Sequence, residues 1–359
     1  MLHKIDFYII KKFLGTFFYA IALIISISIV FDVSENIDDF MSKDVPLKAI
    51  AFDYYLNFIP YYINLYSFLF TFISVIFFTS RMAANSEMIA ILSTGVSYKR
   101  LLLPYMATAS VIAIISLILS NFIIPPTTIN RLEFENRYFK KASTGYVRNI
   151  HRQINPTTFI YLESYNKSVD IAYKFSLERF EDGTLKEKLI SNYMRWDTAQ
   201  KKWAIKDYYI RIIDGLTEKI EKGASKDTTL PVTPIDFKQK ENIVETMNYF
   251  ELNQFIEKEK LRGNDKLESF LVEKHRRLAF PFSTLVLTLI GASIALHKHR
   301  GGTGMHLGLG LLLAAAYIFF MQVFSQYSIN SNMNPEIAVW IPNLIFGIIA
   351  VGLFKNAQK

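Results

Sequence analysis

One short segment, at about residues 84–95, combines the features of a helix that binds a partner. Asn85 or Ser86 can cap a helix, and Glu87 then lies in its first turn, where the helix dipole favours a negative charge. Gly95 favours the end of this helix. An amphipathic helix docked on a partner and an interfacial helix resting among lipid headgroups fit the pattern equally well. The residues expected to make the contact are Asn85, Ser86, Glu87, Met88, Ile91, Leu92 and Gly95.

A second candidate is a basic cluster at Arg276 and Arg277, directly before an apolar stretch. Guanidinium groups form charge-assisted hydrogen bonds with phosphates, so an anionic amphiphile could be held here. The alternative for each residue is an ion pair with Glu268 or Glu273, or contact with the phosphates of ordinary lipids. Phosphate recognition and structural pairing therefore both stay open for this cluster.

Signatures of catalysis and of metal or nucleotide binding are missing from the sequence. It has no cysteine and no phosphate-binding loop, zinc-protease or nucleophile-elbow motif. His297, His299 and His306 could suggest a metal, but they lack acidic companions and a solvated basic loop explains them better. The basic residues are not gathered on one module, which argues against nucleic acid as a partner. We predict no catalytic residue, no metal site and no cofactor in this chain.

The elements that must position these residues are six membrane-spanning helices. Hydrophobic residues make up 51% of the chain and charged residues 20%, and the two kinds are separated along the sequence. About 30 Å of hydrocarbon requires roughly 20 mainly apolar residues. The middle of each apolar run lacks Asp, Glu, Lys and Arg, so the ion relay of a secondary transporter is not expected. The predicted spans are residues 13–31, 53–81, 101–124, 278–296, 305–327 and 337–354, and the third ends at Pro125 and Pro126.

The basic residues near the span ends predict the orientation. With the N-terminus inside, the inner segments hold most of them, including Lys12 and Arg100, whereas the two short outer loops hold only Lys43 and Lys48. We therefore expect a bacterial inner-membrane protein with both termini cytoplasmic, an uncleaved first span and residues 125–277 in the periplasm.

The outer segment is predicted to be an antiparallel β-sandwich followed by a helix that returns to the membrane. Short alternating runs, with a hairpin around residues 197–202, indicate strands, and the apolar spacing after Tyr249 indicates the helix. The chain then divides into residues 1–124 with spans one to three, residues 125–277 outside the membrane, and residues 278–359 with spans four to six.

Span five carries glycines and amides at helical spacing. Gly304 and Gly308, with Gly310 after them, allow close approach of another helix, and ordinary packing explains these glycines completely. Gln322 and Gln326 share one face and would be costly toward lipid, so we expect them to face another helix or a cavity.

This arrangement resembles the lipopolysaccharide-export permeases of the LptF/LptG (YjgP/YjgQ) type over nearly the whole chain. The resemblance rests on the segment from Asn85 to Ser97, on the stretch that runs from Arg277 through Pro281, and on the three-plus-three layout around an outer domain. Trp203 within a β pattern is a weaker agreement. The resemblance implies a polytopic α-helical membrane protein with six transmembrane helices and an inserted periplasmic β-jellyroll domain.

The resemblance also implies an activity and a set of partners. The chain would be the permease subunit of an ABC exporter that extracts lipopolysaccharide from the inner membrane. Its partners would be a cytoplasmic ABC ATPase dimer, which binds the ATP and Mg²⁺, a homologous second permease subunit and a periplasmic jellyroll bridge protein. The helix at residues 84–95 would couple to the ATPase, with Glu87 as the charged contact.

Further site residues follow from the same resemblance. Spans one and five would border the lateral opening for the lipid, with Ile24, Ile27, Gly308, Tyr317 and Gln322 as candidates. Family members hold the glycolipid phosphates with basic residues near the outer end of span one, but that end is acidic here. The replacements that we expect to contact phosphate are Arg131, Arg137, Arg276 and Arg277.

Two other classes of function were weighed against the exporter. A membrane-anchored envelope assembly or scaffold protein would use its periplasmic domain as the working part, and that domain should then function when tethered by a single span. A membrane enzyme has no residues in this sequence to support it.

Overall fold

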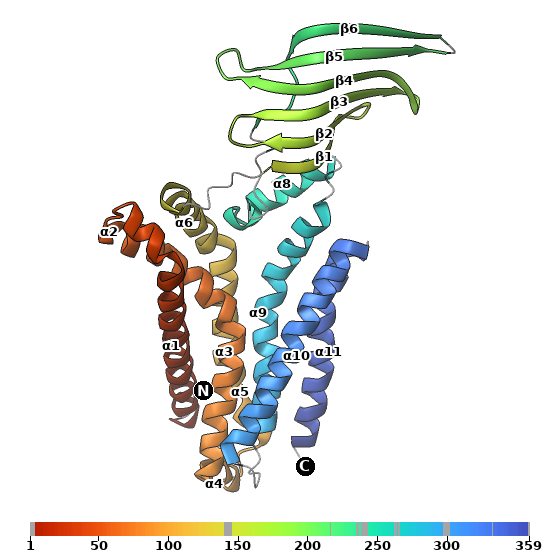
Figure 1. Ribbon diagram of the computed structural model, residues 1–359. Coiled ribbons are helices and arrows are strands. Elements are labelled where there is room, and N and C mark those ends of the chain that lie inside the picture. The colour runs from red at the N-terminus through yellow and green to blue at the C-terminus, as the bar shows by residue number, and fades with distance from the viewer. Residues whose placement is uncertain are drawn as a thin grey trace. The chain divides into compact units, whose positions relative to one another are not determined.

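The computed structural model describes residues 4–139, 146–215, 217–234, 237, 243–261, 264, 266–296, 302–331 and 333–357. The chain forms two compact units. The membrane unit comprises residues up to 139, residues 245–250 and residues from 268 onward, and the sheet unit comprises residues 140–244 and 251–267. Long helices build the first unit and a β-sheet builds most of the second (Figure 1).

Most of the membrane unit consists of long helices. Two of them contain a π-helical segment, η1 or η2, where the backbone turn widens. The part before the sheet contains α1 (Lys4–Ser42), the short α4 (Glu87–Ser93) and two continuous helical stretches. One stretch consists of α2 (Leu47–Ala49), η1 (Ile50–Tyr55) and α3 (Leu56–Ala84), and the other consists of α5 (Tyr98–Ile118), η2 (Leu119–Ile123) and α6 (Ile124–Tyr138). The part after the sheet contains α9 (Leu267–Ala295), α10 (Gly302–Ser331) and α11 (Pro335–Ala357).

Within the described residues, six helical stretches are long and apolar enough to cross a membrane. This finding confirms the six predicted spans and their division around an inserted β domain. Several helices extend beyond their apolar runs. The stretch Leu47–Ala84 has 38 residues, which at about 1.5 Å per residue exceeds the roughly 30 Å of a hydrocarbon core.

The predicted end of the third span at Pro125 and Pro126 is wrong. The helix continues through α6 to Tyr138, and the two prolines lie in the first turn of α6, directly after η2. Proline is tolerated in a first turn because its missing N–H would make no intrahelical bond there. The β-rich part of the chain therefore begins only at Tyr146.

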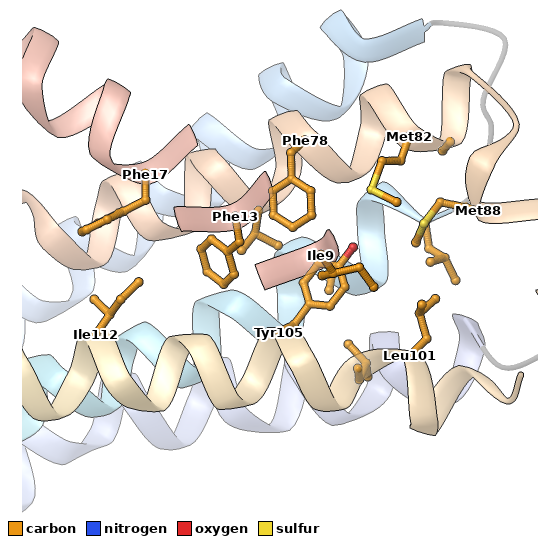
Figure 2. Close-up of a cluster of buried hydrophobic side chains, with 14 of the residues drawn as sticks. Ile9, Phe13, Phe17, Phe78, Met82, Met88, Leu101, Tyr105 and Ile112 are labelled. Carbon is orange, nitrogen blue, oxygen red and sulfur yellow. The ribbon is translucent and has the colours of Figure 1, made fainter. Parts of the chain in front are cut away.

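Helix α3 packs on both sides within the membrane unit. One face carries Val75 and Phe78 into a buried cluster with α1, α4 and α5, where Phe78 lies between Phe13 and Tyr105 with ring centroids 5.5 and 5.2 Å away (Figure 2). Another face carries Phe72 and neighbouring side chains into a second cluster with α9, α10 and α11. Residues at helical spacing thus place two sets of helices around one central span.

Gly310 makes the close contact between α10 and α3 possible. A Cβ atom at this position would approach Ile76 Cδ1 to 2.2 Å, so the buried Ile76 side chain would have to shift. A Cβ atom at Gly304 or Gly308 would meet nothing within 4 Å. The glycine that packing requires is therefore Gly310, whereas Gly304 and Gly308 lie open in this chain.

The sheet unit contains one antiparallel sheet of six described strands that follow each other in sequence order. The predicted hairpin is confirmed, since Trp196 pairs with Trp203 across the turn. The strands are β1 (Tyr146–Asn155), β2 (Thr158–Asn166), β3 (Ile171–Glu181), β4 (Thr184–Asp197), β5 (Lys202–Asp214) and β6 (Thr217–Thr228).

A line of irregular residues crosses this sheet. Asn149, Lys174 and Asp207, on alternate strands, have φ values near +50°, and the ladder skips a pair at each of them. Side chains change face at this line, so Trp203 before it and Ile210 after it both enter the same core. Both strands of each pair skip one residue here, so the register of the ladder is the same on the two sides of the line. The predicted antiparallel domain is confirmed, but its described strands form a single meander sheet rather than two separate layers.

The helix predicted after Tyr249 is also confirmed, as α8 (Tyr249–Leu261). Leu252 and Ile256 are buried, as their spacing indicates. The helix is fixed to the sheet unit by Arg152, whose guanidinium donates to the fully buried Glu259 carboxylate at 2.7 Å. A charge without solvent is stabilised only when it is paired, so this bond sets the position of α8 on β1.

Candidate functional site

The helix predicted at about residues 84–95 is the seven-residue α4. Gly95 ends the turn after it with φ +87°, as predicted. The predicted side-chain cap is wrong, because Ser86 adopts a left-handed conformation and caps nothing; Asn85 instead donates to the Glu87 carboxylate at 3.4 Å. Met88 is buried in the membrane unit's own core, and Ile91 and Leu92 pack against that core. The apolar face of α4 therefore contacts this chain itself.

Glu87 is held by helix α1. The Tyr8 hydroxyl donates to Glu87 Oε2 at 2.7 Å, and the Lys12 ammonium lies 3.8 Å from Glu87 Oε1. The Tyr8 hydrogen bond, and to a lesser degree Asn85 and the charges of Lys12 and Arg81, hold the pKa of Glu87 below its usual range against the opposing effect of burial. The carboxylate is thus charged and ties α4 to the beginning of α1.

A second ion pair ties α1 to α5. The Arg100 guanidinium donates to both carboxylate oxygens of Asp6, at 2.8 and 2.6 Å, and only 4% of the Asp6 side chain is exposed. Sequence reasoning used Arg100 only to orient the chain and missed this pair. The available signal was an acid in the first turn of one span and a base in the first turn of another. Asp6, Tyr8, Lys12, Glu87 and Arg100 are called the α4 cluster below.

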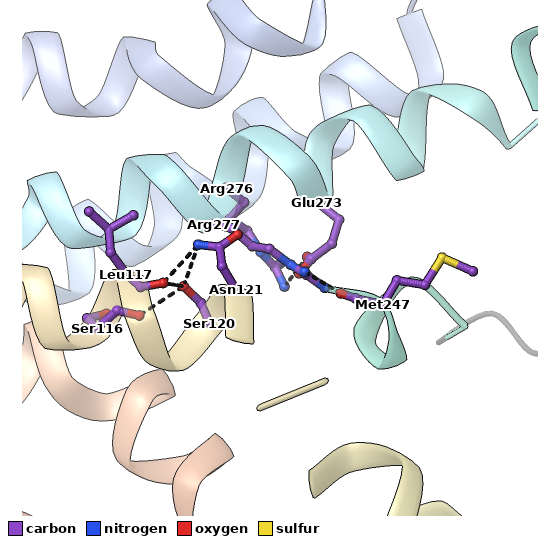
Figure 3. A network of polar contacts seen from close by, with 8 residues as sticks. All are labelled: Ser116, Leu117, Ser120, Asn121, Met247, Glu273, Arg276 and Arg277. Atoms are coloured by element: carbon purple, nitrogen blue, oxygen red, sulfur yellow. Dashed lines mark hydrogen bonds and ion pairs between the residues drawn. The ribbon is translucent and has the colours of Figure 1, made fainter. Parts of the chain in front are cut away.

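The arginines near the start of the fourth span are paired within the chain. Arg276 Nη2 lies 2.9 Å and Arg277 Nε 3.3 Å from the two oxygens of Glu273. Arg277 also donates to the main-chain oxygen of Met247 at 2.8 Å (Figure 3). Arg277 is 7% exposed and Arg276 is 37% exposed. Structural pairing, the alternative left open for these residues, is therefore what the structure shows.

Arg276 and Arg277 line a partly open pocket in the membrane unit. Glu245 lines it too, on the short turn η3 (Ile243–Thr246), together with Tyr61. Arg131 stacks over the Tyr61 ring at 5.2 Å. Sequence reasoning missed Glu245, which carries no local pattern. The pocket is called the arginine pocket below, and its remaining lining residues are Asn64, Leu65, Ser120, Ile124, Glu273, Phe280 and Pro281.

Two polar residues of η2, Ser120 and Asn121, lie near the arginine pocket (Figure 3). Ser120 donates to the main-chain oxygen of Ser116 at 2.9 Å, and Asn121 donates to that of Leu117 at 2.9 Å (Figure 3). The Asn121 Oδ1 atom is buried without a hydrogen-bond partner in the part of the chain that the structure describes. The arginine pocket is therefore bordered by backbone and side-chain dipoles as well as by charges.

Arg137, the fourth candidate for phosphate contact, does not line the arginine pocket. Its guanidinium lies over the Tyr138 ring at 5.9 Å, and its main-chain oxygen accepts a hydrogen bond from Lys43 at 3.4 Å. It borders a separate shallow depression that includes Asp53 and Glu133.

The candidates for a lateral opening occupy different environments. On α1, Ile27 is 41% exposed, whereas Ile24 packs partly against the core. On α10, Gln322 is exposed and lies in an apolar depression with Gln326. Tyr317 is fully buried and donates to Asn343 Oδ1 of α11 at 2.9 Å, so it does not share the exposed face of Gln322.

A polar contact between α1 and the π-helical η1 also escaped the sequence. Asp32 accepts hydrogen bonds from the hydroxyls of Tyr54 at 3.0 Å and Tyr55 at 2.9 Å. The two tyrosines join a buried aromatic cluster with Phe134 of α6.

No group of three potential metal ligands occurs among the described residues. His306 is buried in α10, and His297 and His299 lie outside the described residues. Nothing in the described part of the chain therefore assembles a metal centre from the histidines.

Comparison with protein families gives a match over residues 7–356 to the model described as lipopolysaccharide export system permease LptF/LptG. The match extends over the candidate spans and the sheet unit. No individually curated protein matches the chain.

Proposed function

Because this chain belongs to the LptF/LptG family of lipopolysaccharide export permeases, we propose that it is one half of the transmembrane part of an ABC exporter. A separate cytoplasmic ATPase dimer supplies the energy, since the sequence has no phosphate-binding loop. A homologous permease forms the other half. The family match over nearly the whole chain is the observation that carries this proposal.

The proposed orientation places α4 and both termini in the cytoplasm and the sheet unit in the periplasm. The basic residues around α4, including Lys12, Arg81 and Arg100, support this orientation by the positive-inside rule. With α4 in the cytoplasm, its exposed polar side becomes accessible to the ATPase. Glu87 then has two tasks, because it holds α1 through Tyr8 and also offers a charge to the partner.

Movement of α4 would reach the first span directly. Tyr8 and Lys12 bind Glu87, and Asp6 binds Arg100 at the start of α5, so α1 is attached to both ends of the loop that carries α4. A displacement of α4 by the ATPase therefore pulls on α1. The exposed Ile27 of that helix and the exposed Gln322 of α10 are the proposed borders of the opening on this chain.

The lipid phosphates are proposed to bind at the arginine pocket. Arg276 is partly exposed there, and Arg131 lies beside it through Tyr61. The acyl chains would pass onward along the sheet unit to a periplasmic bridge of similar β-structure. An exposed sheet edge supports this step, since edge strands pair with strands of other chains.

Gentle solubilisation tests the proposal. The chain should copurify with an ATPase and a second permease, and ATP turnover of the complex should change when lipopolysaccharide is added. Glu87→Arg should release the ATPase while the fold stays intact. If the sheet unit supported envelope assembly when tethered by a single span, the scaffold function would replace the exporter.

A further inference from the structure

Glu245 occupies an unusual place in the membrane unit. It lines the arginine pocket on a four-residue turn and has no hydrogen bond or ion pair within the residues that the structure describes. Its neighbours include three arginines, all close enough to act on its charge. The Glu245 carboxylate therefore interacts with the arginines through charge attraction alone, without a directed hydrogen bond.

The charges around Glu245 are balanced only while it is ionised. Three arginines, at positions 131, 276 and 277, face the carboxylates of Glu135, Glu245 and Glu273. Loss of the Glu245 charge leaves one positive charge uncompensated, which is the condition for binding an anion. The groups that face Glu245 from the neighbouring helices are Tyr61 of α3, Arg131 of α6, and Glu273, Arg276 and Arg277 of α9.

The backbone near Glu245 is fixed, although its side chain is not bonded. Arg277 donates to the main-chain oxygen of Met247 and pairs with Glu273, so its guanidinium is occupied. Arg276 is the more exposed arginine of the two. The Glu245 side chain can therefore swing away while its turn stays in place, and a ligand would gain the partly exposed Arg276.

We propose that the charge of the Glu245 carboxylate stands in for the phosphate of an anionic lipid headgroup, and that an arriving headgroup takes its place beside Arg276, within the field of Arg131. Guanidinium groups favour phosphate oxygens, and the apolar lining by Leu65, Phe280 and Pro281 on membrane helices suits a lipid rather than free phosphate. The inference rests on the phosphate contacts of the proposed function. It adds that the Glu245 carboxylate of the chain itself competes with the lipid phosphate for the arginines.

Displacement should depend on pH. Burial, together with the charge of Glu273, raises the pKa of Glu245 above its usual range, although the three arginines oppose this effect. A protonated Glu245 carries no charge and competes weakly. Lipid binding should therefore strengthen as the pH falls through this raised pKa, and a variant without the carboxyl should lose that part of the pH dependence.

The test measures binding of a fluorescent phosphatidic acid to the full-length chain in phosphatidylcholine nanodiscs. At pH 7.5, Glu245→Gln should tighten binding by roughly three- to tenfold, because a repulsive charge is removed. Arg276→Gln should weaken binding. Glu133→Gln removes an exposed carboxylate from the same helix as Arg131 and should change nothing. Thermal unfolding confirms that each variant is folded.

The outcomes separate this inference from the proposed function. Unchanged binding in Glu245→Gln, with weakened binding in Arg276→Gln, overturns the competitor and keeps the phosphate site. Weaker binding in Glu245→Gln also overturns it and indicates that Glu245 supports the bound headgroup instead of competing with it. Unchanged binding in both variants removes the phosphate contacts themselves. Competition by inorganic phosphate as strong as by the lipid would show that free phosphate, not a headgroup, is the ligand.

Discussion

The α4 cluster and the arginine pocket are both charged regions of the membrane unit, but they differ in how completely their groups are paired. In the α4 cluster, Asp6 has both oxygens bonded to Arg100, and Glu87 accepts a hydrogen bond from Tyr8. In the arginine pocket, Glu245 has neither kind of bond within the described residues. The first region fixes a geometry, whereas the second keeps capacity for a ligand.

This difference has a physical basis. A bidentate bond between arginine and carboxylate sets both distance and orientation, so the Asp6–Arg100 pair fixes α1 to α5. An unbonded carboxylate in a pocket costs free energy through desolvation, and any group that replaces it recovers part of that cost. Side chains that hold two helices together therefore need all their hydrogen bonds made, whereas a side chain that a ligand replaces must have few of them made.

The largest effect is expected at the most completely paired group. Asp6→Asn should lower the unfolding midpoint of the detergent-solubilised chain by roughly 5 °C, because Arg100 loses both charged bonds and the buried amide replaces them poorly. Differential scanning fluorimetry measures this change. The exchange Asp6→Arg with Arg100→Asp should restore part of the loss. An unchanged midpoint in Asp6→Asn would mean that the pair does not fix α1 to α5.

Variants of Arg277 and Arg276 test whether the more completely bonded arginine of the pocket stabilises the fold while the more exposed one binds lipid. Arg277→Gln should reduce stability by about 2 kcal/mol, because the Met247 oxygen and Glu273 lose a buried donor. Arg276→Gln should cost less stability and should weaken lipid binding instead. Denaturant unfolding and the nanodisc assay measure the two effects. Equal stability losses in the two variants would contradict the distinction.

The sequence predicted the helices and strands better than the side-chain partners. Six apolar runs of membrane-spanning length and the alternation in β4 and β5 gave the fold class, because burial imposes these periods on any such chain. The end of the third span was misplaced because Pro125 and Pro126 read as a stop, although a preceding π-helical turn places them at a helix start.

The partners of the site residues could not be predicted in the same way. The expected contact of Glu87 with a separate protein stays a prediction, but the sequence did not indicate that Tyr8, 79 positions earlier in the chain, binds it. Glu245 joins the arginines only because η3 comes back to the membrane unit after the sheet. Such contacts depend on tertiary geometry, which leaves no period or spacing in one sequence.

A variant of Tyr8 tests whether the α4 cluster takes part in function. Tyr8→Phe should cost at most about 1 kcal/mol of stability, since Tyr8 is partly exposed, but it should loosen α4 from α1. In the assembled exporter, ATP turnover should then depend less on added lipopolysaccharide. Tyr19→Phe on the same helix is the matched control, because Tyr19 is 73% exposed. Equal coupling in both variants would show that the bond between Tyr8 and Glu87 transmits nothing.

The pH dependence of that bond has a definite sign. The pKa of Glu87 lies below its usual range, chiefly because Tyr8 donates a hydrogen bond to the charged form. The stabilisation is therefore present at neutral pH and disappears as the pH falls through the lowered pKa. The difference in stability between wild type and Tyr8→Phe should vanish in the same acidic range. A difference that persisted there would mean that the neutral carboxyl keeps the contact.

The smallest effect is expected at Lys12, the outermost member of the α4 cluster. Its ammonium lies 3.8 Å from Glu87 and is 36% exposed, so water screens the attraction. Lys12→Gln should change stability by about 0.3 kcal/mol and leave lipid-dependent ATP turnover close to wild type. A loss as large as that of Tyr8→Phe would show that charge, rather than the directed hydrogen bond, ties α4 to α1. The α4 cluster would then depend on charge attraction without a directed bond, as Glu245 does in the arginine pocket, and added salt would weaken the exposed Lys12 pair.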